Sequence, residues 1–422
     1  MDVANLTIAF SEHTKHKNTS INWLNSIPND WTEKEGMLFM RESKEKNHGM
    51  KRKVVLSLSY GRIRVKEEKE LTGLVPESFE TYQLVNVGDI IFRPTDLQND
   101  KVSLRSSISE YEGIITSAYL NLRVKSIAHS KFIHYLFRAI DNNKVIYGLG
   151  SGLRQNIDFR DFRRLKFPFP PKQEQTAIAN FLDDKTAKID QAIAQKQRLI
   201  ELLKERKQII IQKTVTKGLD PNAKLKDSGI QCIGKIPEHW EIKNLRYAFE
   251  FLNKRRIPLS ASERESKQGR YPYYGASGII DYVDDYLFNE DSILIAEDGA
   301  NLLSKSTPLA FVASGKYWVN NHAHILKPMY YGFLYWAELL SIIDYTNVIT
   351  GAAQPKLSRE KLGGVRVIIP SKDEIKTIEQ AVARINSEFR ITIKGLKTSI
   401  SQLKEYKSVL IESAVTGKIK VI

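Results

Sequence analysis

The chain contains two tandem copies of one sequence pattern. The run IPNDW at 27–31 recurs as IPEHW at 236–240, which is 209 residues later. Farther along, residues 157–216 match residues 357–416 at a constant offset of 200. One offset held over such a length indicates a duplication, and the duplication predicts two similar structural units. A length of 422 residues also exceeds what a single core usually organises.

Each copy begins with a segment of short, β-branched runs. Examples are VVLSL at 54–58, DIIF at 89–92 and SILI at 292–295, and Gly, Asn and Pro separate such runs. Helix-like stretches lie among them, at 131–140 and 331–343. This alternation predicts an α+β fold, with one globular mixed α/β domain in each copy.

Each copy ends in a long helical segment. The first opens after Pro170 and Pro171, and the second opens at Ser371 with the S-x-x-E form of a capping box. Glycines at 218 and 417 are placed to end the two helices. About 45 residues at roughly 1.5 Å each give a rod on the order of 65 Å, which is longer than one globular domain covers.

Apolar residues recur in both helical segments at alternating spacings of four and three. The seam in the first runs from Leu182 through Ile189, Ile193 and Ile200, and the second repeats it 200 residues later. Polar residues interrupt both seams at 186/386 and at 207/407. The pattern predicts that the two helices form an antiparallel coiled coil, which relates the domains by a pseudo-two-fold axis. The alternative, each helix lying on its own domain, needs a broader apolar face.

The charge balance points to a polyanionic partner. The chain has 64 Lys+Arg against 49 Asp+Glu, a formal net charge of +15. This suits nucleic acid or an acidic membrane surface, although a basic protein without such a partner remains the alternative. Residues 1–20 lack an apolar leader, and no stretch of 18 apolar residues occurs. The lone Cys232 excludes an intrachain disulfide and fits a reducing compartment, so a cytoplasmic protein is expected.

Motifs for familiar chemistries are missing from the sequence. There is no P-loop for ATP, and the GLGSG at 148–152 is interpreted as a tight loop because its counterpart at 350–353 reads TGAA. No Asn-Pro-Pro-Tyr motif for methyl transfer occurs. His322 and His324 lack a third ligand nearby and are interpreted as the polar face of a strand. We expect no catalytic and no metal site in this chain; an unrecognised active site is the alternative.

Three runs give the chain a family resemblance. They are SGI at 228–230 leading into IPEHW at 236–240, LRQNI at 153–157, and FPFPPKQEQ at 167–175. With these runs the chain resembles the specificity (S) subunit of Type I restriction–modification systems, over about residues 18–418. Two departures stand out: Ile375 replaces a Gln in the second copy, and the first 17 residues have no counterpart. The resemblance implies an N-terminal arm at 1–17, target-recognition domains at 18–168 and 219–368, a spacer helix at 169–218, and a second spacer helix with a C-terminal tail at 369–422.

The resemblance also implies a function and its partners. Each domain would read one half of a bipartite, asymmetric site in double-stranded DNA. Two methyltransferase (M) subunits and two restriction (R) subunits would join the chain, and S-adenosylmethionine, ATP and Mg²⁺ would belong to those partners. The competing hypothesis is a coiled-coil scaffold that binds only protein and has lost DNA reading.

Candidate DNA-contacting residues are polar, basic or aromatic and follow strand-like or glycine-containing segments. Basic side chains bind phosphates, whereas Arg, Gln, Asn and Tyr can also read base edges. Any one of them is equally well explained as a solvated surface residue. The candidates are Tyr60, Arg62, Arg64, Arg93, Arg154, Gln155 and Asn156 in the first domain, and Arg270, Tyr273, Tyr274, Ser277, His322, Gln354 and Lys356 in the second.

Overall fold

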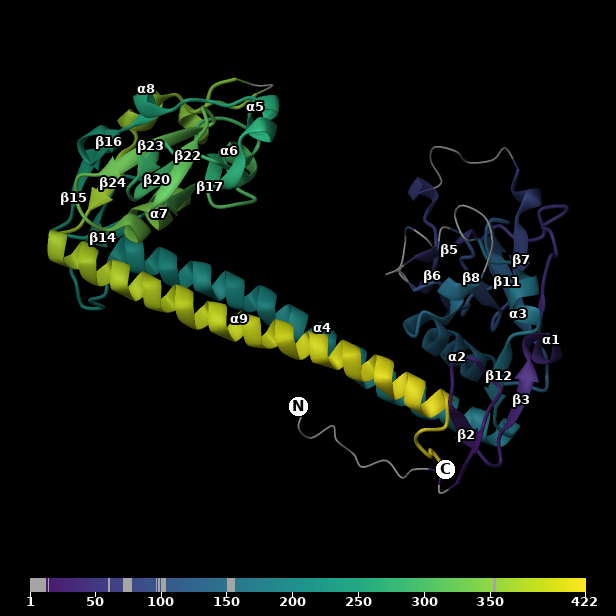
Figure 1. The fold of residues 1–422 in the computed structure, drawn as a ribbon. Coiled ribbons are helices and arrows are strands. Elements are labelled where there is room, and N and C mark those ends of the chain that lie inside the picture. Colours follow the sequence, from purple (N-terminus) through teal and green to yellow (C-terminus); the bar gives the residue numbers. More distant parts are fainter. Residues whose placement is uncertain are drawn as a thin grey trace. The chain divides into compact units, whose positions relative to one another are not determined.

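The computed structural model describes residues 13, 15–59, 61–70, 78–95, 97, 99, 104–149, 156–351 and 354–422. The chain divides into two compact units (Figure 1). Unit 1 combines Met1–Gln197 with Lys397–Ile422, and unit 2 is Arg198–Leu396. Each unit therefore holds one globular domain together with half of each long helix.

The domain of unit 1 is built around a four-stranded antiparallel sheet in the order β4-β11-β8-β9. These strands are β4 (Met40–Glu42), β11 (Leu120–Val124), β8 (Ile90–Phe92) and β9 (Ser106–Ile108). Helices α1 (Gly36–Phe39), α2 (Ser130–Asn142) and α3 (Phe159–Arg163) accompany the sheet. The other strands form antiparallel pairs: β1 (His16–Asn18) with β2 (Ser26–Pro28), β3 (Thr32–Glu35) with β12 (Lys166–Phe169), β5 (Leu56–Ser59) with β6 (Arg62–Val65), and β7 (Gln83–Val85) with β10 (Gly113–Ile115).

The domain of unit 2 repeats this plan and adds a second sheet. Its common sheet has the order β16-β23-β20-β21, from β16 (Phe249–Phe251), β23 (Ala323–Pro328), β20 (Ser292–Ala296) and β21 (Ala310–Ala313). The added sheet is β18 (Gly278–Val283), β17 (Gln268–Gly275), β22 (Lys316–Val319) and β19 (Phe288–Asn289). Two further pairs of strands are antiparallel: β13 (Leu225–Asp227) with β14 (Lys235–Pro237), and β15 (Glu241–Asn244) with β24 (Arg366–Ile369). The α-helices of this domain are α5 (Ala261–Ser266), α6 (Asn301–Ser304), α7 (Phe333–Ile342) and α8 (Arg359–Gly364).

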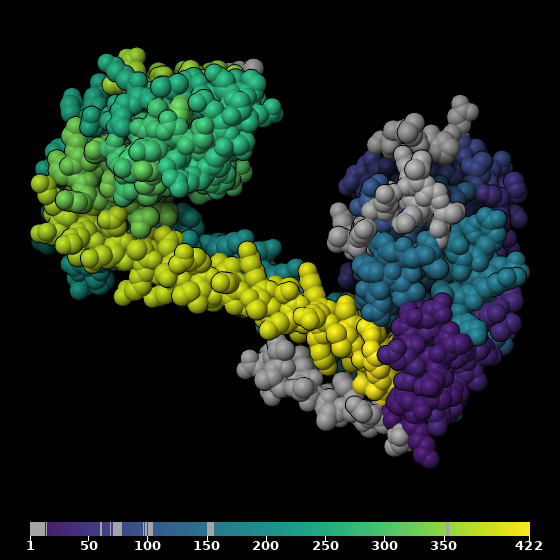
Figure 2. Space-filling view, viewed as in Figure 1, coloured from purple at the N-terminus to yellow at the C-terminus, as the bar shows by residue number. Residues whose placement is uncertain are grey.

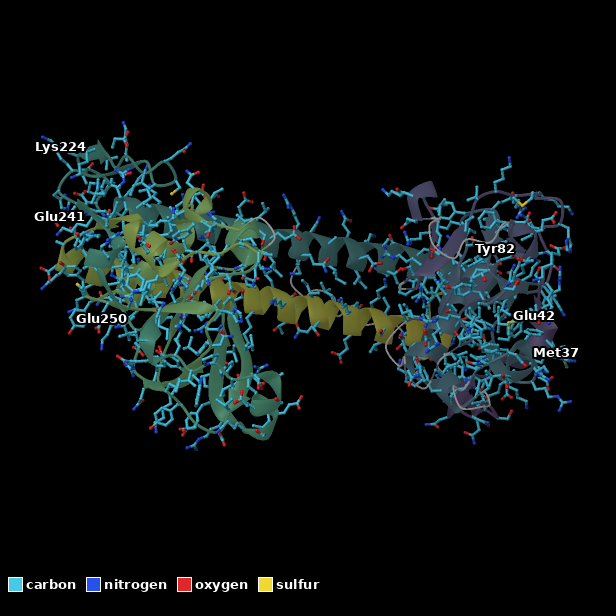
Figure 3. The ribbon with its side chains drawn as sticks, turned by 90° about the horizontal axis from the view of Figure 1, so that it is seen from above. Met37, Glu42, Tyr82, Lys224, Glu241 and Glu250 are labelled. Atoms are coloured by element: carbon cyan, nitrogen blue, oxygen red, sulfur yellow. The ribbon has the colours of Figure 1, made fainter. Side chains whose placement is uncertain are left out.

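The two central sheets share one strand order, so the mixed α/β domain predicted for each copy is confirmed. The sequence positions agree too, because β4, β8, β9 and β11 correspond in order to β16, β20, β21 and β23. Glu42 of β4 and Glu250 of β16, both labelled in Figure 3, lie on the corresponding edge strands. The duplication is therefore visible in topology, while the additional sheet of unit 2 is where the copies diverge.

The long helices begin and end where the sequence signals lie. They are α4 (Lys172–Lys217) and α9 (Lys372–Val415). At the start of α9 the Ser371 amide donates to the Glu374 carboxylate at 3.2 Å, and the Glu374 amide donates to Ser371 Oγ at 3.3 Å. This exchange is the capping box expected from the sequence. Gly218 and Gly417 follow the last turns with φ of 71° and 77°, the left-handed conformation that favours glycine.

The seam residues of the two helices are buried or half-buried. In unit 1, Leu182 and Ile189 of α4 and Leu403 and Leu410 of α9 are at most 4% exposed. Unit 1 pairs the first half of α4 with the last half of α9, and unit 2 holds the reverse halves. The helices therefore run antiparallel, and the predicted coiled coil is confirmed.

The polar interruptions of the seam attach the domains to the helices. Thr186 Oγ1 of α4 lies 3.2 Å from the hydroxyl of Tyr135 on α2, and both side chains are buried. In unit 2 the side chain of Asn386 on α9 hydrogen-bonds Glu338 on α7. A buried polar group is costly without a partner. The contacts of Thr186 and Asn386 with the neighbouring domains therefore explain why both seams carry a polar residue at the equivalent positions 186 and 386.

A buried tryptophan fixes the start of each long helix. Trp31 Nε1 donates to Glu174 Oε2 at 3.0 Å, and Trp240 Nε1 donates to Glu374 Oε1 at 3.1 Å. Both indole rings are fully buried. The conspicuous Ile-Pro-x-x-Trp runs of the two copies thus supply the residue that joins each domain to its helix.

The expected N-terminal arm at 1–17 needs one correction. His16 and Lys17 lie in β1, which pairs with β2 in the way that β13 pairs with β14. The ring of His16 also lies 3.2 Å from the carbonyl oxygen of Gly417, at the end of α9. Figure 2 shows the last residues of the chain, in yellow, against the first described residues, in purple. Residues 1–12 lie outside the described part of the chain.

We expect Trp31→Phe to destabilise unit 1 by about 1–3 kcal/mol more than Trp240→Phe destabilises unit 2. Both changes remove the same ring volume and the same indole donor. Glu174 is only 6% exposed and would keep, among the described residues, only the ring of His13 with Nε2 at 3.6 Å, whereas Glu374 retains hydrogen bonds from Ser371 and His239. Urea denaturation of the full-length variants measures the difference, and equal losses would contradict it.

Candidate nucleic-acid interface

The two domains share a backbone frame at one end of the central sheet. In unit 1 the amide of Ile157 donates to the carbonyl of Pro94 at 2.9 Å, just beyond β8. In unit 2 the amide of Leu357 donates to the carbonyl of Glu297 at 2.7 Å, just beyond β20. Each bond joins the end of a central strand to the segment that precedes the next short helix. Side chains from distant parts of the sequence therefore meet there.

In unit 2 this frame carries a network of charged side chains. Arg256 Nη1 lies 2.7 Å from Glu297 Oε2, and Lys356 Nζ lies 3.6 Å from Glu297 Oε1. Arg256 also donates to the carbonyl of Ala323 at 2.7 Å. Glu297 is 14% exposed and Lys356 is 56% exposed. The carboxylate is thus held in place from inside the domain, while the lysine beside it reaches solvent.

A histidine and an aspartate stand beside this network. Nδ1 of His322 lies 2.9 Å from both carboxylate oxygens of Asp298, and the histidine side chain is 46% exposed. The backbone links the same segments, because Glu297 N–H donates to His322 O at 2.9 Å and Gly299 N–H donates to Pro355 O at 3.0 Å. The segments that hold the candidates His322, Gln354 and Lys356 are therefore adjacent to the segment 297–299.

His322 and His324 do not share a polar strand face, which corrects the sequence-based interpretation. His324 is fully buried on β23, with Nε2 2.7 Å from the carbonyl oxygen of Leu357 and Nδ1 2.7 Å from the Asn253 amide. Burial lowers the pKa of His324, so the ring is neutral. Among the described residues, no group of three or more His, Cys, Asp or Glu side chains could hold a metal ion.

The candidates of unit 1 are dispersed over two places. Arg93 follows β8 and is half-buried, and Asn156 is exposed beside Ile157 in the shared frame. Arg62 and Arg64 lie on β6 rather than in a loop; Arg64 Nη1 is 2.7 Å from Glu70 Oε1. The predictions for Tyr60, Arg154 and Gln155 fall outside the described residues.

The candidates on β17 belong to the additional sheet of unit 2. Arg270 is exposed and its guanidinium lies 5.0 Å from the centre of the Tyr271 ring. Ser277 is exposed in the turn between β17 and β18. These two residues present polar groups to solvent, in a strand and a hairpin turn.

The two candidate tyrosines of that strand, Tyr273 and Tyr274, are covered by other side chains instead. Tyr273 is fully buried, and its hydroxyl accepts the Leu259 amide at 2.9 Å, so it belongs to the core and not to a DNA-contacting surface. Neighbouring side chains of a strand point to opposite faces, and both faces of β17 are covered here, because Tyr273 belongs to one apolar cluster and Tyr274 packs against another. Tyr274 is half-buried, with its ring centre 5.6 Å from that of Tyr317.

Arg256 is a residue of this network that was not among the candidates predicted from the sequence. Arg256 fixes Glu297 from the opposite side of the network, yet in the sequence it is only the last member of the basic run at 254–256. Its contact spans 41 residues, so local pattern alone carries no signal for it. Gln354, which was selected, is exposed two residues before Lys356.

The chemistry of the unit 2 network suits the edges of base pairs. Glu297 and Asp298 are fixed acceptors, and Lys356 is an exposed donor beside them. Carboxylates can accept from cytosine amino groups, and lysine can donate to guanine. Because acidic and basic groups alternate here, the surface is better suited to reading bases than to holding phosphates alone.

Comparison with known proteins gives a family match over both copies. The sequence model of the Type I restriction modification DNA specificity domain matches residues 102–202 and 237–405. A Haemophilus influenzae type I restriction enzyme specificity subunit, S.HindORF215P, is 35% identical over 155 residues, or 35% of this chain and 38% of that one. The MjaVIII specificity subunit of Methanocaldococcus jannaschii is 23% identical over 334 residues, or 74% of this chain and 75% of that one.

Solved structures share the fold at low sequence identity. A chain from a structure of an assembled type I R-M system aligns with a TM-score of 0.64 at 13% identity, covering 93% of this chain and 99% of that chain. The HsdS subunit of Thermoanaerobacter tengcongensis aligns with a TM-score of 0.50 at 15% identity, covering 93% and 98%. The arrangement of two mixed α/β domains and long helices is therefore one that solved chains also have.

Proposed function

This chain belongs to the Type I restriction modification DNA specificity family, and we propose that each of its two domains reads one half of a bipartite DNA site. DNA sequence recognition in a Type I restriction–modification system is its function. The duplication supports the assignment of one half-site to each domain, because the family model matches the chain twice, mainly in unit 1 and mainly in unit 2. Two DNA-reading domains on one chain can recognise two half-sites at a fixed separation.

Divergence between the domains supports two different half-sites. The shared frame carries Asn156 in unit 1 and Lys356 in unit 2, at corresponding positions. In the same frame, Pro94 of unit 1 corresponds to Glu297 of unit 2, which forms salt bridges that a proline cannot form. The same backbone therefore offers different donors and acceptors, so the two halves of the site should be unrelated in sequence and the whole site asymmetric.

The remaining chemistry is assigned to partner subunits. Two methyltransferase subunits would modify the site that this chain selects, and two restriction subunits would cleave unmodified DNA. S-adenosylmethionine, ATP and Mg²⁺ would bind to those partners, and this chain would contribute recognition without catalysis. The assembly would work in the cytoplasm, where it meets DNA. Within the described part of the chain, none of the helices has the length and apolar character needed to cross a bilayer.

Methylation-aware sequencing tests the proposal directly. DNA from cells that express this chain with its methyltransferase should carry one modified motif of two short, unlike parts separated by a fixed gap. Cells that express the methyltransferase without this chain provide the control. A continuous motif, or methylation that does not depend on this chain, would overturn the proposal.

We expect DNA binding by the methyltransferase complex to weaken steeply with salt. Each Lys or Arg that neutralises a phosphate releases counterions, so log K falls with log salt at a slope near −0.9 per contact. With 64 basic residues against 49 acidic ones, several such contacts are expected. Affinity for non-specific duplex should fall by roughly 100-fold or more between 50 and 200 mM salt. A flat plot would contradict this.

We expect Asp298→Asn to weaken binding to the specific site by about ten-fold, because base-edge contacts are each worth about 1–3 kcal/mol. The change removes the charge of the carboxylate that orients the exposed His322 ring, and it leaves the fold of the loop unchanged. Binding to non-specific duplex should be unchanged. Asp284→Asn, in an exposed turn of the same unit, is the matched control. Equal effects of the two substitutions would exclude Asp298 and His322 from recognition.

A further inference from the structure

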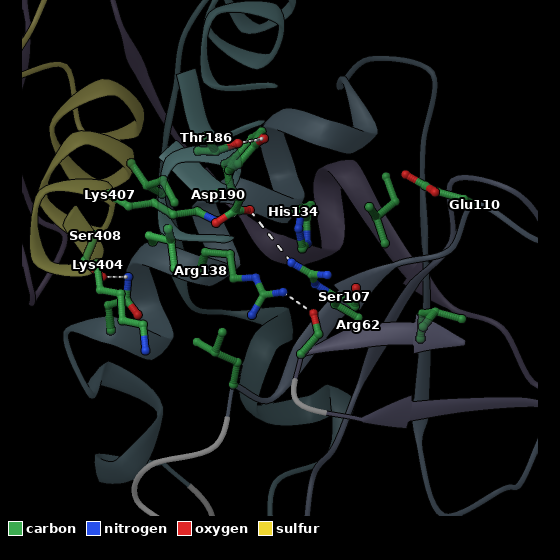
Figure 4. A pocket seen from close by; sticks show the side chains of 18 of the residues that line it. Arg62, Ser107, Glu110, His134, Arg138, Thr186, Asp190, Lys404, Lys407 and Ser408 are labelled. Atoms are coloured by element: carbon green, nitrogen blue, oxygen red, sulfur yellow. Dashed lines mark hydrogen bonds and ion pairs between the residues drawn. The ribbon is translucent and has the colours of Figure 1, made fainter. Parts of the chain in front are cut away.

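Unit 1 contains a cleft of about 830 Å³ between α2, the β6–β9 region and the helix pair (Figure 4). Its lining includes the apolar side chains of Ile63 and Ile108 and the ring of Tyr111. Four basic residues line it as well, namely Arg62 from β6, Arg138 from α2, and Lys404 and Lys407 from α9, against the two carboxylates of Glu110 and Asp190. The size falls within the range of about 300–1,000 Å³ typical of small-molecule sites.

Two polar groups inside the cleft lack partners among the described residues. Nη1 of Arg138 is buried and has no hydrogen-bond partner there, although Nη2 donates to the carbonyl of Gly61. Nδ1 of His134, one turn earlier on α2, is also buried without a partner in the described part of the chain. Burial lowers the pKa of Arg138 to about 10, which leaves it charged at neutral pH. A charged donor that is removed from water and left unpaired is costly, and an anion would relieve that cost.

The cleft also carries an excess of positive charge. Asp190 is occupied by Lys407, whose Nζ lies 2.7 Å from both of its carboxylate oxygens. Arg62 reaches the same carboxylate only at 3.8 Å. Within the described ranges, no carboxylate forms an ion pair with Arg138 or Lys404. Two cations thus remain for a ligand from outside the chain.

We propose that this cleft binds a small molecule that carries a phosphate group. The planar guanidinium of Arg138 presents donors suited to a phosphate oxyanion, and Lys404 adds a second positive charge. The apolar residues of the lining, with the Tyr111 ring, accommodate the uncharged part of the molecule. A backbone phosphate of DNA offers the same oxyanion chemistry, and the experiment below separates the two sources.

The site is a property of unit 1 and not of the duplicated fold. The contacts of Tyr135 with Thr186 and of Glu338 with Asn386 align α2 with α7, and this alignment places Ser341 where unit 1 has Arg138. In unit 2 the corresponding hollow is lined by Glu338 and Ser341, and Ser341 Oγ is 3.2 Å from the amide nitrogen of Ala310. The fold is therefore built there without an arginine, so Arg138 is not required by the shared architecture.

Isothermal titration of the full-length chain tests the proposal with inorganic phosphate and adenosine monophosphate, at constant ionic strength in chloride buffer. We expect binding at one site per chain. Arg138→Gln should weaken it at least ten-fold, and Lys404→Gln several-fold. Arg384→Gln removes an exposed cation from α9 outside the cleft and should leave the affinity unchanged.

Each other outcome overturns the proposal. Absence of binding by both probes does so, as does an equal affinity of the Arg138 and Arg384 variants. If Arg138→Gln fails to fold, the exposed Lys404→Gln decides alone. If neither small probe binds but a short DNA duplex does, and Arg138→Gln weakens the binding of that duplex, the cleft contacts the DNA backbone instead. This test is independent of the DNA-reading proposal, because it uses no DNA site and no methyltransferase activity.

Discussion

Replacing residues 227–368 with the corresponding segment of another family member will change one half of the methylated motif and leave the other half unaltered. The replaced segment forms most of unit 2, including its own central sheet and the Glu297 network. The segments that form the domain of unit 1 lie entirely outside it. A complete change of half-site is a larger effect than any single side chain can produce, since several base contacts change together.

The exchange must preserve the attachment of the new domain to the helices. Ile211 and Val215 of α4, together with Ile375 and Val382 of α9, are buried in the core of unit 2. A donor segment with matching apolar residues around Trp240 is therefore needed. Methylation mapping of the hybrid measures the result, and the reciprocal exchange of residues 18–168 is the control. Changes in both half-sites after one exchange would contradict independent reading.

Inserting one heptad into each long helix will lengthen the gap between the half-sites by about three base pairs. Seven helical residues add roughly 10 Å of rise, and DNA advances about 3.4 Å for each base pair. Both insertions are required because both helices pass through both units. The suitable points follow Gln197 and Leu396, where the two compact units divide. Seven residues keep the seam on one face, so the antiparallel packing survives.

The half-site sequences themselves should not change with this insertion. A two-residue insertion at the same points provides a control for register, because it turns the seam by roughly 200° out of the interface and should reduce folding instead. Closer to the domain, an insertion after Lys213 would shift Val215, which is fully buried in the core of unit 2. A methylated motif with an unchanged gap and full activity would show that the helices do not set the spacing.

The sequence was sufficient to predict those parts of the fold that depend on periodicity or on local capping. The seam from Leu182 onward, the capping box at Ser371 and the glycines that end the helices depend on neighbours three to four residues away, and all were predicted. The additional sheet of unit 2 could not be foreseen, because its parallel pairing of β17 with β22 joins segments more than forty residues apart. Long-range pairing of this kind leaves little local signal.

The candidate site shows the same division. His322, Gln354 and Lys356 were chosen as polar residues near strand ends, and the structure brings their segments together. Tyr273 was chosen for its chemistry alone, and its burial could be known only once the face of β17 was fixed. Arg256 shows the opposite error, since its importance comes from one contact made across the fold.

The contact between His16 and Gly417 has a consequence for how such a chain can be cut. In unit 2 the end of α4 continues through a short connection into β13, whereas in unit 1 Gly417, just after α9, lies beside His16 of β1 without a covalent connection between them. A circularly permuted gene that joins 417 to 16 and opens between 217 and 225 would therefore preserve every strand pairing described for both units.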